Sequence, residues 1–327
     1  MARLDEKAML VKFSVSQWTA KKNDKRIEKE VEEKHNAHDA GRYNKVLIAK
    51  EEIKKIQTFA NDARTYHYTN TLPWKDEGER VLPTTLYFEY CRQMQEKKTA
   101  FEKAVKTFID NYPALIDQAK ARLNGMFSPA DYPSAKKISK KFSFQWEFSP
   151  IPTAQDFRLD LQSEEISKIS ADLERRLKAT EQEAISDLWQ RLFDTVSHAA
   201  ERLGDPEAVF RNSLVENIQD LVNLLPKLNF TDDPTLETMR REVEKKLLKF
   251  SADTLREDAD ARKRTAEEAK ELLKGIKPHV GNVEDEQQQP ETPTPTAAAA
   301  PQPAAPAPPT PTPEEVQGKL DAMATLF

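Results

Sequence analysis

The sequence has few of the residues from which catalytic and cofactor sites are commonly built. Cys91 is the single cysteine among 327 residues, so the chain can form neither an internal disulfide nor a thiolate cluster, and we expect a reducing compartment. The seven glycines are never closer together than six positions, which leaves no phosphate-binding glycine loop and no dinucleotide fingerprint. HExxH, GxSxG and CxxC motifs are also absent. We therefore expect a protein that binds rather than catalyses, without a cofactor.

Metal ligands and long apolar segments are scarce as well. His35 and His38 stand three positions apart beside Asp39, but the segment is charged and offers no further ligand, so we predict no metal site. No run of about 18 apolar residues is present, which argues against a membrane-spanning helix. The first 13 residues, MARLDEKAMLVKF, lack the apolar centre of a secretory signal. These features together predict a cytoplasmic protein without membrane contact.

Charge is abundant and unevenly distributed along the chain. Charged residues make up 32% of the sequence and hydrophobic residues 38%, a composition typical of long amphipathic helices with solvated outer faces. Residues 1–150 hold 28 basic and 21 acidic side chains, a net charge of +7, whereas residues 151–327 hold 22 and 34, a net of −12. The basic front half is consistent with polyanion binding. Chance drift of charge along solvated helices explains the same difference.

The periodicity of apolar residues predicts an α+β fold that is mostly helical. Alternating apolar and polar residues predict strands at 9–18, 142–149 and 157–161. Helical spacing predicts one helix from about 43 to 66 and another from Thr84, which Pro113 breaks or restarts before Gly125. The segment between them, 69–83, contains two prolines and a glycine and is predicted to be a loop. We expect a small antiparallel sheet of about three strands packed on long helices, within a mixed α/β binding region at 1–162.

Residues 163–280 are predicted to form a helical region that extends from this sheet as a helical hairpin. One long apolar stripe ends near Gly204, a second helix is expected from Pro206, and Asp233-Pro234 is a typical capped start for a third. The third becomes almost wholly charged after residue 250, which indicates a segment that projects into solvent or pairs with a partner helix.

The end of the chain has a different composition. Residues 281–313 are rich in proline and alanine and lack an apolar stripe, so we predict a disordered, extended linker. Residues 314–327, EEVQGKLDAMATLF, regain apolar side chains that can share one face of a short helix. We predict that this acidic and hydrophobic tip binds a partner protein through Leu320, Met323, Leu326 and Phe327.

Several segments of the front half place aromatic rings beside cationic side chains. Rings of this kind stack on bases of any identity while Lys and Arg contact phosphates, a combination that suits single-stranded nucleic acid. The segment 64–74 is the strongest of them because its aromatic residues stand in polar surroundings, although such rings also fold back onto a protein core. The predicted nucleic-acid-binding residues are Trp18, Lys21, Lys22, Lys25, Arg26, Arg42, Tyr43, Lys45, Arg64, Tyr66, Tyr68, Trp74, Lys136, Lys137 and Lys140.

Two resemblances extend this interpretation. The Pro-rich linker followed by an acidic tip ending in Phe327 is similar to the tail of bacterial single-stranded-DNA-binding proteins, although the tip lacks the dense Asp run and the penultimate proline of that family. In that family the tip recruits replication and repair proteins. The segments FSVSQWTAKK (13–22) and DAGRYNK (39–45) resemble a family of tailed-bacteriophage and prophage proteins of ill-defined role, found among early genes. That resemblance implies a phage origin and the host cytoplasm, and it supplies no catalytic residue.

We therefore predict a non-enzymatic protein that binds single-stranded DNA without sequence preference in phage replication or recombination. Its partners would be single-stranded DNA and, at the tip, replication or recombination proteins. A homo-oligomer is also compatible with the sequence. The alternative is a phage structural or assembly protein, scaffold-like or filament-forming, whose charged helices self-associate.

Overall fold

The computed structural model describes residues 4–74, 78–153 and 163–280, and its mostly helical α+β fold confirms the predicted class. Residues 1–281 form one compact unit, and residues 282–327 are assigned to a second. The helices are α1 (Leu4–Lys7), α2 (Lys25–His35), α3 (Lys50–Thr69), α4 (Tyr87–Leu123), α5 (Ala135–Ser139), α6 (Ser163–Gly204), α7 (Ser213–Leu228), α8 (Pro234–Leu247), α9 (Ala252–Glu257) and α10 (Ala259–Ile276). The strands are β1 (Ala8–Ser16), β2 (Lys21–Asn23), β3 (Asn44–Val46), β4 (Leu72–Pro73), β5 (Glu79–Pro83) and β6 (Ser143–Ser149).

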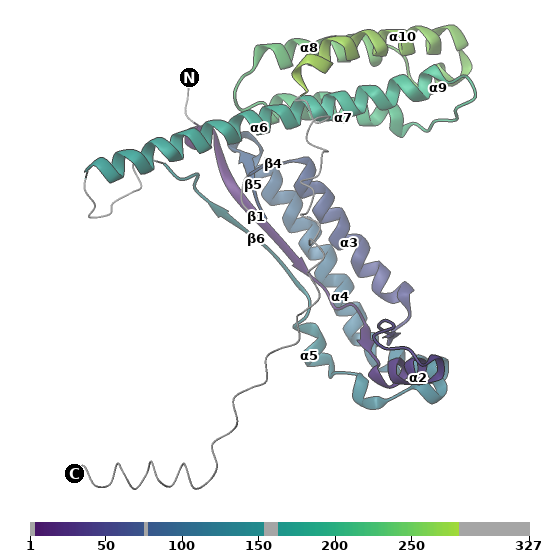
Figure 1. The fold of residues 1–327 in the computed structure, drawn as a ribbon. Helices are drawn as coiled ribbons and strands as arrows, with labels where there is room; N and C mark the ends of the chain where they lie inside the picture. Colours follow the sequence, from purple (N-terminus) through teal and green to yellow (C-terminus); the bar gives the residue numbers. More distant parts are fainter. Residues whose placement is uncertain (1–3, 75–77, 154–162, 281–327) are drawn as a thin grey trace, which may run out of the picture. The chain divides into compact units, whose positions relative to one another are not determined.

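The main sheet is antiparallel throughout, with the strand order β4-β5-β1-β6 (Figure 1). β1 and β6 confirm two predicted strands, while the third, at 157–161, lies outside the described residues. The prediction of a loop at 69–83 was wrong, because β4 and β5 lie there. Pro73 and Pro83 are compatible with this hairpin since each stands at the end of its strand, and Pro73 is on the sheet edge.

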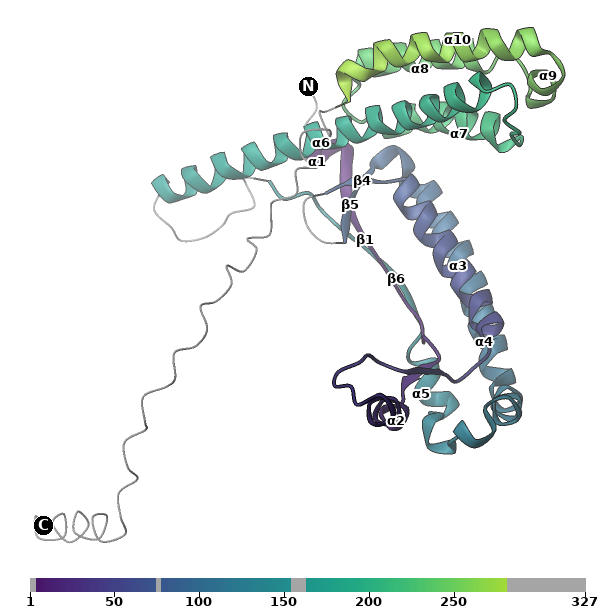
Figure 2. The same ribbon diagram turned by 45° about the vertical axis from the view of Figure 1, so that its right-hand side comes forward.

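Helices α3 and α4 pack against each other and cover one side of the sheet (Figure 2). α3 begins at Lys50, later than predicted, because Asn44–Val46 pairs with Lys21–Asn23 as the separate two-stranded sheet β2-β3. α4 continues through Pro113, where a break was predicted. Tyr112 and Leu115 on either side of the proline are buried, so packing of this face offsets the lost backbone hydrogen bond.

The predicted helical extension is present, and four of its helices contact one another in a ring. α6 contacts α7 and α10, and α8 contacts the same two helices. The second helix begins at Ser213 rather than at Pro206, whereas Asp233 caps α8 as predicted by accepting from the backbone N–H of Thr235 and Leu236. No helix in the described ranges is both long and apolar enough to cross a membrane.

The charged segment after residue 250 does not project into solvent. It breaks into α9 and α10, and α10 packs against α6 and α8. The buried face of α10 consists mainly of small and aliphatic residues, which let helices approach closely. These are Ala261, Thr265, Ala266, Ala269, Leu272 and Ile276. Of the two predicted alternatives, projection into solvent is wrong and α10 instead pairs with other helices. Alanines at helical spacing form an apolar face that a count of charges does not reveal.

Candidate nucleic-acid interface

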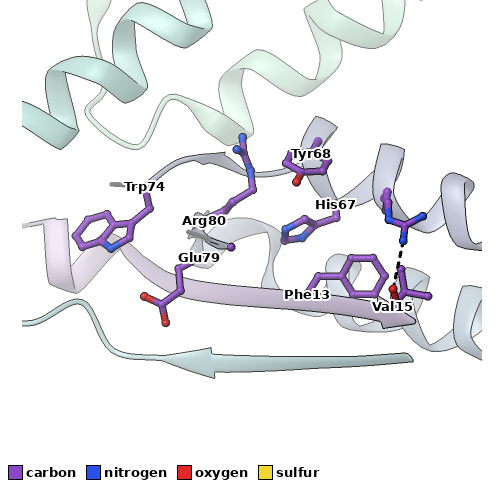
Figure 3. Close-up of a pocket in the computed structure, with 9 residues that line it drawn as sticks. Phe13, Val15, His67, Tyr68, Trp74, Glu79 and Arg80 are labelled. Carbon is purple, nitrogen blue, oxygen red and sulfur yellow. Dashed lines mark hydrogen bonds between the residues drawn. The ribbon is translucent and has the colours of Figure 1, made fainter. Parts of the chain in front are cut away.

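A small pocket lies where the end of α3 meets β1 and the β4-β5 hairpin (Figure 3). Its volume is about 200 Å³, below the range of roughly 300–1,000 Å³ usual for small-molecule sites. Trp74 stands at one end and Phe13, His67 and Tyr68 at the other, with Arg80 between them. We call it the Tyr68 pocket, and it is lined by Phe13, Val15, Arg64, His67, Tyr68, Trp74, Gly78, Glu79 and Arg80.

Arg80 and Tyr68 form the centre of this pocket. The Arg80 guanidinium lies 4.8 Å from the centroid of the Tyr68 ring, a cation–π distance. Its Nε donates to Thr71 Oγ1 at 2.7 Å and one Nη donates to Thr71 O at 3.1 Å. These two bonds fix the plane of the guanidinium. They do not use its remaining N–H groups. Burial and the nearby Arg191 lower the pKa of Arg80, but an arginine stays protonated in a protein.

The backbone that carries Tyr68 is held from the helical region. Arg191 of α6 donates to the carbonyls of Tyr68, Thr69 and Thr71 at 3.2, 2.6 and 2.7 Å. The last carbonyls of a helix have no partner within the helix, so Arg191 satisfies the end of α3 and fixes the position of the pocket.

His67 contributes an uncharged ring to the floor of the pocket. Its side chain is buried, and Nδ1 lies 2.7 Å from the hydroxyl of Tyr90. Burial and the charge of Arg80 lower the pKa of His67 to about 4. The imidazole is therefore neutral near pH 7, and the positive charge of the pocket comes from its arginines.

Two aromatic rings predicted to stack on bases are instead packed against the body. Trp18 is 5% exposed, with Phe108 and Tyr112 around its ring. Tyr66 is half-buried on α3 beside Tyr90, and burial raises its pKa to about 12. The prediction for Trp18 is therefore wrong, and the ring of Tyr66 is mainly a packing element. Packing these two aromatic rings against the core stabilises the fold more than exposing them to solvent would.

Lys45 is also placed differently from the prediction. Its side chain is buried, and Nζ lies 2.8 Å from Asp24 Oδ2, 2.6 Å from Asp131 Oδ2 and 3.1 Å from Met126 O. Burial opposes its charge, but the hydrogen bonds to Asp131 and Asp24 outweigh this and raise its pKa. The hydrogen bond from Lys45 in turn lowers the pKa of Asp24. Two carboxylates and a backbone carbonyl surround the buried ammonium, so Lys45 is not available to a phosphate.

The β2-β3 pairing brings two of the predicted basic segments together. Lys22 stands opposite Lys45 in the register and forms an ion pair with Asp131 at 2.7 Å. An open cavity of about 630 Å³ lies here, lined by Lys22, Asn23, Asp24, Lys25, Arg26, Lys45, Ser128 and Asp131. The predicted basic and aromatic residues that stay exposed around this part of the chain are Lys21, Lys22, Lys25, Arg26, Arg42, Tyr43, Lys136, Lys137 and Lys140.

The end of β1 connects the Tyr68 pocket with the lysines that precede β6. Arg64 of α3 donates to the carbonyl of Val15 at 3.2 Å. The next residue, Ser16, donates through its hydroxyl to the carbonyl of Lys141 at 3.1 Å. Arg64 and Lys141, far apart in the sequence, therefore flank the same strand end.

Of the residues that line the Tyr68 pocket, sequence reasoning missed Phe13, Val15, His67, Gly78, Glu79 and Arg80. Phe13 stands in an alternating strand and Arg80 in a segment predicted to be a loop, so neither carried a signal for a site. Within the described ranges, no three His, Cys, Asp or Glu side chains are grouped closely enough to hold a metal ion.

The candidate interface thus consists of the Tyr68 pocket and the exposed cations near the end of β1. Comparison of the chain with known proteins finds no matching family model, no similar curated protein and no similar solved structure.

Proposed function

We propose that this protein binds single-stranded DNA without sequence preference, through the Tyr68 pocket and the exposed cations near the end of β1. The observation that carries the proposal is the exposed ring of Tyr68 held against the Arg80 guanidinium, beside Trp74 and Arg64. Aromatic and guanidinium planes stack on any base, which suits binding that ignores sequence.

Packing alone does not account for the position of Tyr68. Its side chain is 56% exposed, so burial of its ring stabilises the fold little. Arg80 nevertheless stacks on the ring, and Arg191 holds the carbonyl of Tyr68 and the backbone that follows it. A rigid and exposed aromatic ring loses little conformational freedom when a ligand stacks on it, which favours a role in binding.

The charges near this ring suit the backbone of a nucleic acid. Arg64 and Arg80 line the pocket itself, and Arg64 shares the end of β1 with the segment that ends in Lys140 and Lys141. A nucleic-acid backbone that runs from the pocket towards the end of β1 would meet these lysines. Contacts of this kind provide affinity that depends on salt and not on sequence.

The biological setting is proposed from the sequence resemblances. They favour a phage protein of DNA replication or recombination that acts in the host cytoplasm. The C-terminal residues Leu320, Met323, Leu326 and Phe327 lie outside the described residues, and their role as a tip that recruits partner proteins belongs to the same proposal.

A mobility-shift titration of the full chain tests the proposal. We expect oligo-dT to bind more tightly than a duplex of equal length, with log affinity falling against log salt by about 0.7 for each phosphate contacted. Mixed-sequence oligonucleotides should bind with the same affinity as oligo-dT of that length. Equal affinity for duplex, or no shift at low salt, would contradict the proposal and favour the assembly protein.

A further inference from the structure

β6 forms an edge of the main sheet. All seven of its residues pair with β1, from Ser143 opposite Ser16 to Ser149 opposite Leu10. Among the described residues no strand pairs with its other side. A strand in that position presents a row of unpaired N–H and C=O groups, ready to pair with another strand.

Apart from the charge of Glu147, the features that usually prevent pairing at such an edge are missing from β6. The strand SFQWEFS contains neither proline nor glycine, and its register with β1 runs without a bulge. Its one charged residue is Glu147, and lysines occur only before it, at 140 and 141. Among the described residues, this strand of seven residues with three aromatic side chains therefore has one edge without a partner strand.

An apolar groove runs beside the same edge, between β6 and α4. Its volume is about 260 Å³. Val105, Ile109 and Phe142 are only partly buried in it, although they contact the hydrophobic core. The residues that line the groove are Phe101, Glu102, Val105, Lys106, Ile109, Ser139, Phe142, Ser143 and Phe144. A strand added to β6 would cover this groove with the side chains that face α4, as in other strand-addition complexes.

The sequence of β6 can pair with itself over its full length in one antiparallel register. In an antiparallel pair, directly opposite residues point to the same face of the sheet. The two-fold axis that relates two copies of β6 must therefore pass between two copies of the same residue. It cannot pass midway between two successive residues. A two-fold axis at Trp146 pairs all seven residues and places Phe144 opposite Phe148 and Gln145 opposite Glu147. An axis at Glu147 would instead bring two carboxylates together, which is unfavourable.

We propose that two copies of this chain pair along β6, antiparallel about a two-fold axis at Trp146. The main sheets of the two copies then become one continuous sheet of eight strands. The partner's Phe148 lies opposite Phe144, where the apolar groove begins, and the partner's Pro150 lies opposite Phe142. A second copy is favoured over an unrelated strand for two reasons. This register places no like charges opposite each other. A two-fold interface also uses the same surface of each copy, so no other protein is needed.

Two substitutions at one exposed position test the register. Gln145 is exposed and stands opposite the neutral Ser14 on β1, so a charge at 145 leaves the monomer largely unaffected. In the proposed dimer, Gln145→Glu places a carboxylate opposite Glu147 twice, whereas Gln145→Lys places an ammonium there. Light scattering after size exclusion, on nuclease-treated full-length protein at about 1–100 µM, measures the dimer equilibrium.

We expect the wild type to dimerise and Gln145→Glu to weaken the dimer about tenfold, from two unfavourable cross-strand pairs. Gln145→Lys should dimerise at least as well as the wild type, with unchanged circular-dichroism melts for both variants. A wild type that stays monomeric over this range overturns the proposal, and so does an equal effect of the two substitutions. Because no nucleic acid is present, neither outcome depends on whether the chain binds DNA.

Discussion

Tyr66 and Tyr68 are two residues apart on α3, yet they have different environments. Tyr68 is 56% exposed, whereas Tyr66 is half-buried between Tyr90 and the Lys97 ammonium, which lies 5.2 Å from its ring centroid. Residues two positions apart on a helix face different directions. A pattern of aromatic residues in the sequence therefore cannot say which ring is available to a ligand.

The two tyrosines give matched variants. Tyr68→Ala should weaken binding to oligo-dT by about 1–3 kcal/mol, the usual contribution of one base stacked on a ring, with little change in melting temperature. Tyr66→Ala should lower the melting temperature because it removes buried aromatic area. Fluorescence-anisotropy titrations and circular-dichroism melts of both variants separate the two effects. A loss of stability in Tyr68→Ala without a loss of affinity would count against the pocket as a binding site.

The lowered pKa of His67 predicts how the stability of the protein depends on pH. Its folded-state pKa of about 4 lies below the value of about 6.5 in an unfolded chain. The unfolded state therefore takes up the proton first, and stability that is complete above pH 6.5 is lost as pH falls towards 4. Because of this residue, we expect the free energy of unfolding to fall by about 2 kcal/mol between about pH 7.5 and pH 5.

Urea unfolding at the two pH values checks this expectation. His67→Leu should lose less stability than the wild type between them, although it is less stable at both because Tyr90 loses its partner. His35→Gln, at the exposed end of α2, is the matched control and should behave as the wild type does. If His67→Leu keeps the full pH dependence, the buried histidine is not its source.

At the scale of elements, Lys45 connects the β2-β3 sheet with the segment that follows α4. Asp24 precedes α2 and Asp131 lies beyond α4, and their carboxylates are only 11% and 8% exposed. Burying such charges is costly unless they are paired. Lys45 therefore has a structural role, and its own charge does not indicate a ligand.

Substitution of the two neighbouring lysines distinguishes a structural charge from a surface charge. Lys45→Met should cost about 3 kcal/mol of unfolding free energy, because it leaves Asp24 buried without its ammonium partner. Lys22→Met breaks an ion pair with the same Asp131, but Lys22 is 50% exposed, and it should cost less than about 1 kcal/mol. Urea unfolding of both variants measures the difference. Equal costs would mean that the buried network contributes no more than a surface pair.

At the scale of the whole molecule, the hydrophobic core that the structure describes draws on residues from Leu4 to Val280. Truncation of residues 314–327 should therefore leave the melting temperature of the protein unchanged. The same truncation should abolish recruitment of replication or recombination proteins, because it removes the predicted partner-binding side chains. Circular-dichroism melts and pull-downs with the full-length and truncated chains measure both. A large fall in melting temperature would show that the tip belongs to the core.

The sequence by itself determined the elements whose signals are local. The alternation from Phe142 to Phe148 predicted β6, and the Asp233-Pro234 cap predicted the start of α8. Both succeed because side-chain period and N-cap chemistry involve residues a few positions apart. The same local reasoning gave a mostly helical fold with a small antiparallel sheet.

Only the tertiary structure decided which residues of the predicted interface are exposed. Trp18 is buried by Phe108 and Tyr112, some 90 residues later, and Lys45 is neutralised in part by Asp131. Arg80 reaches Tyr68 because two short strands form where prolines indicated a loop. Burial, ion pairing and strand pairing depend on contacts between distant segments, whose free energies outweigh local propensity and leave no periodic trace in the sequence.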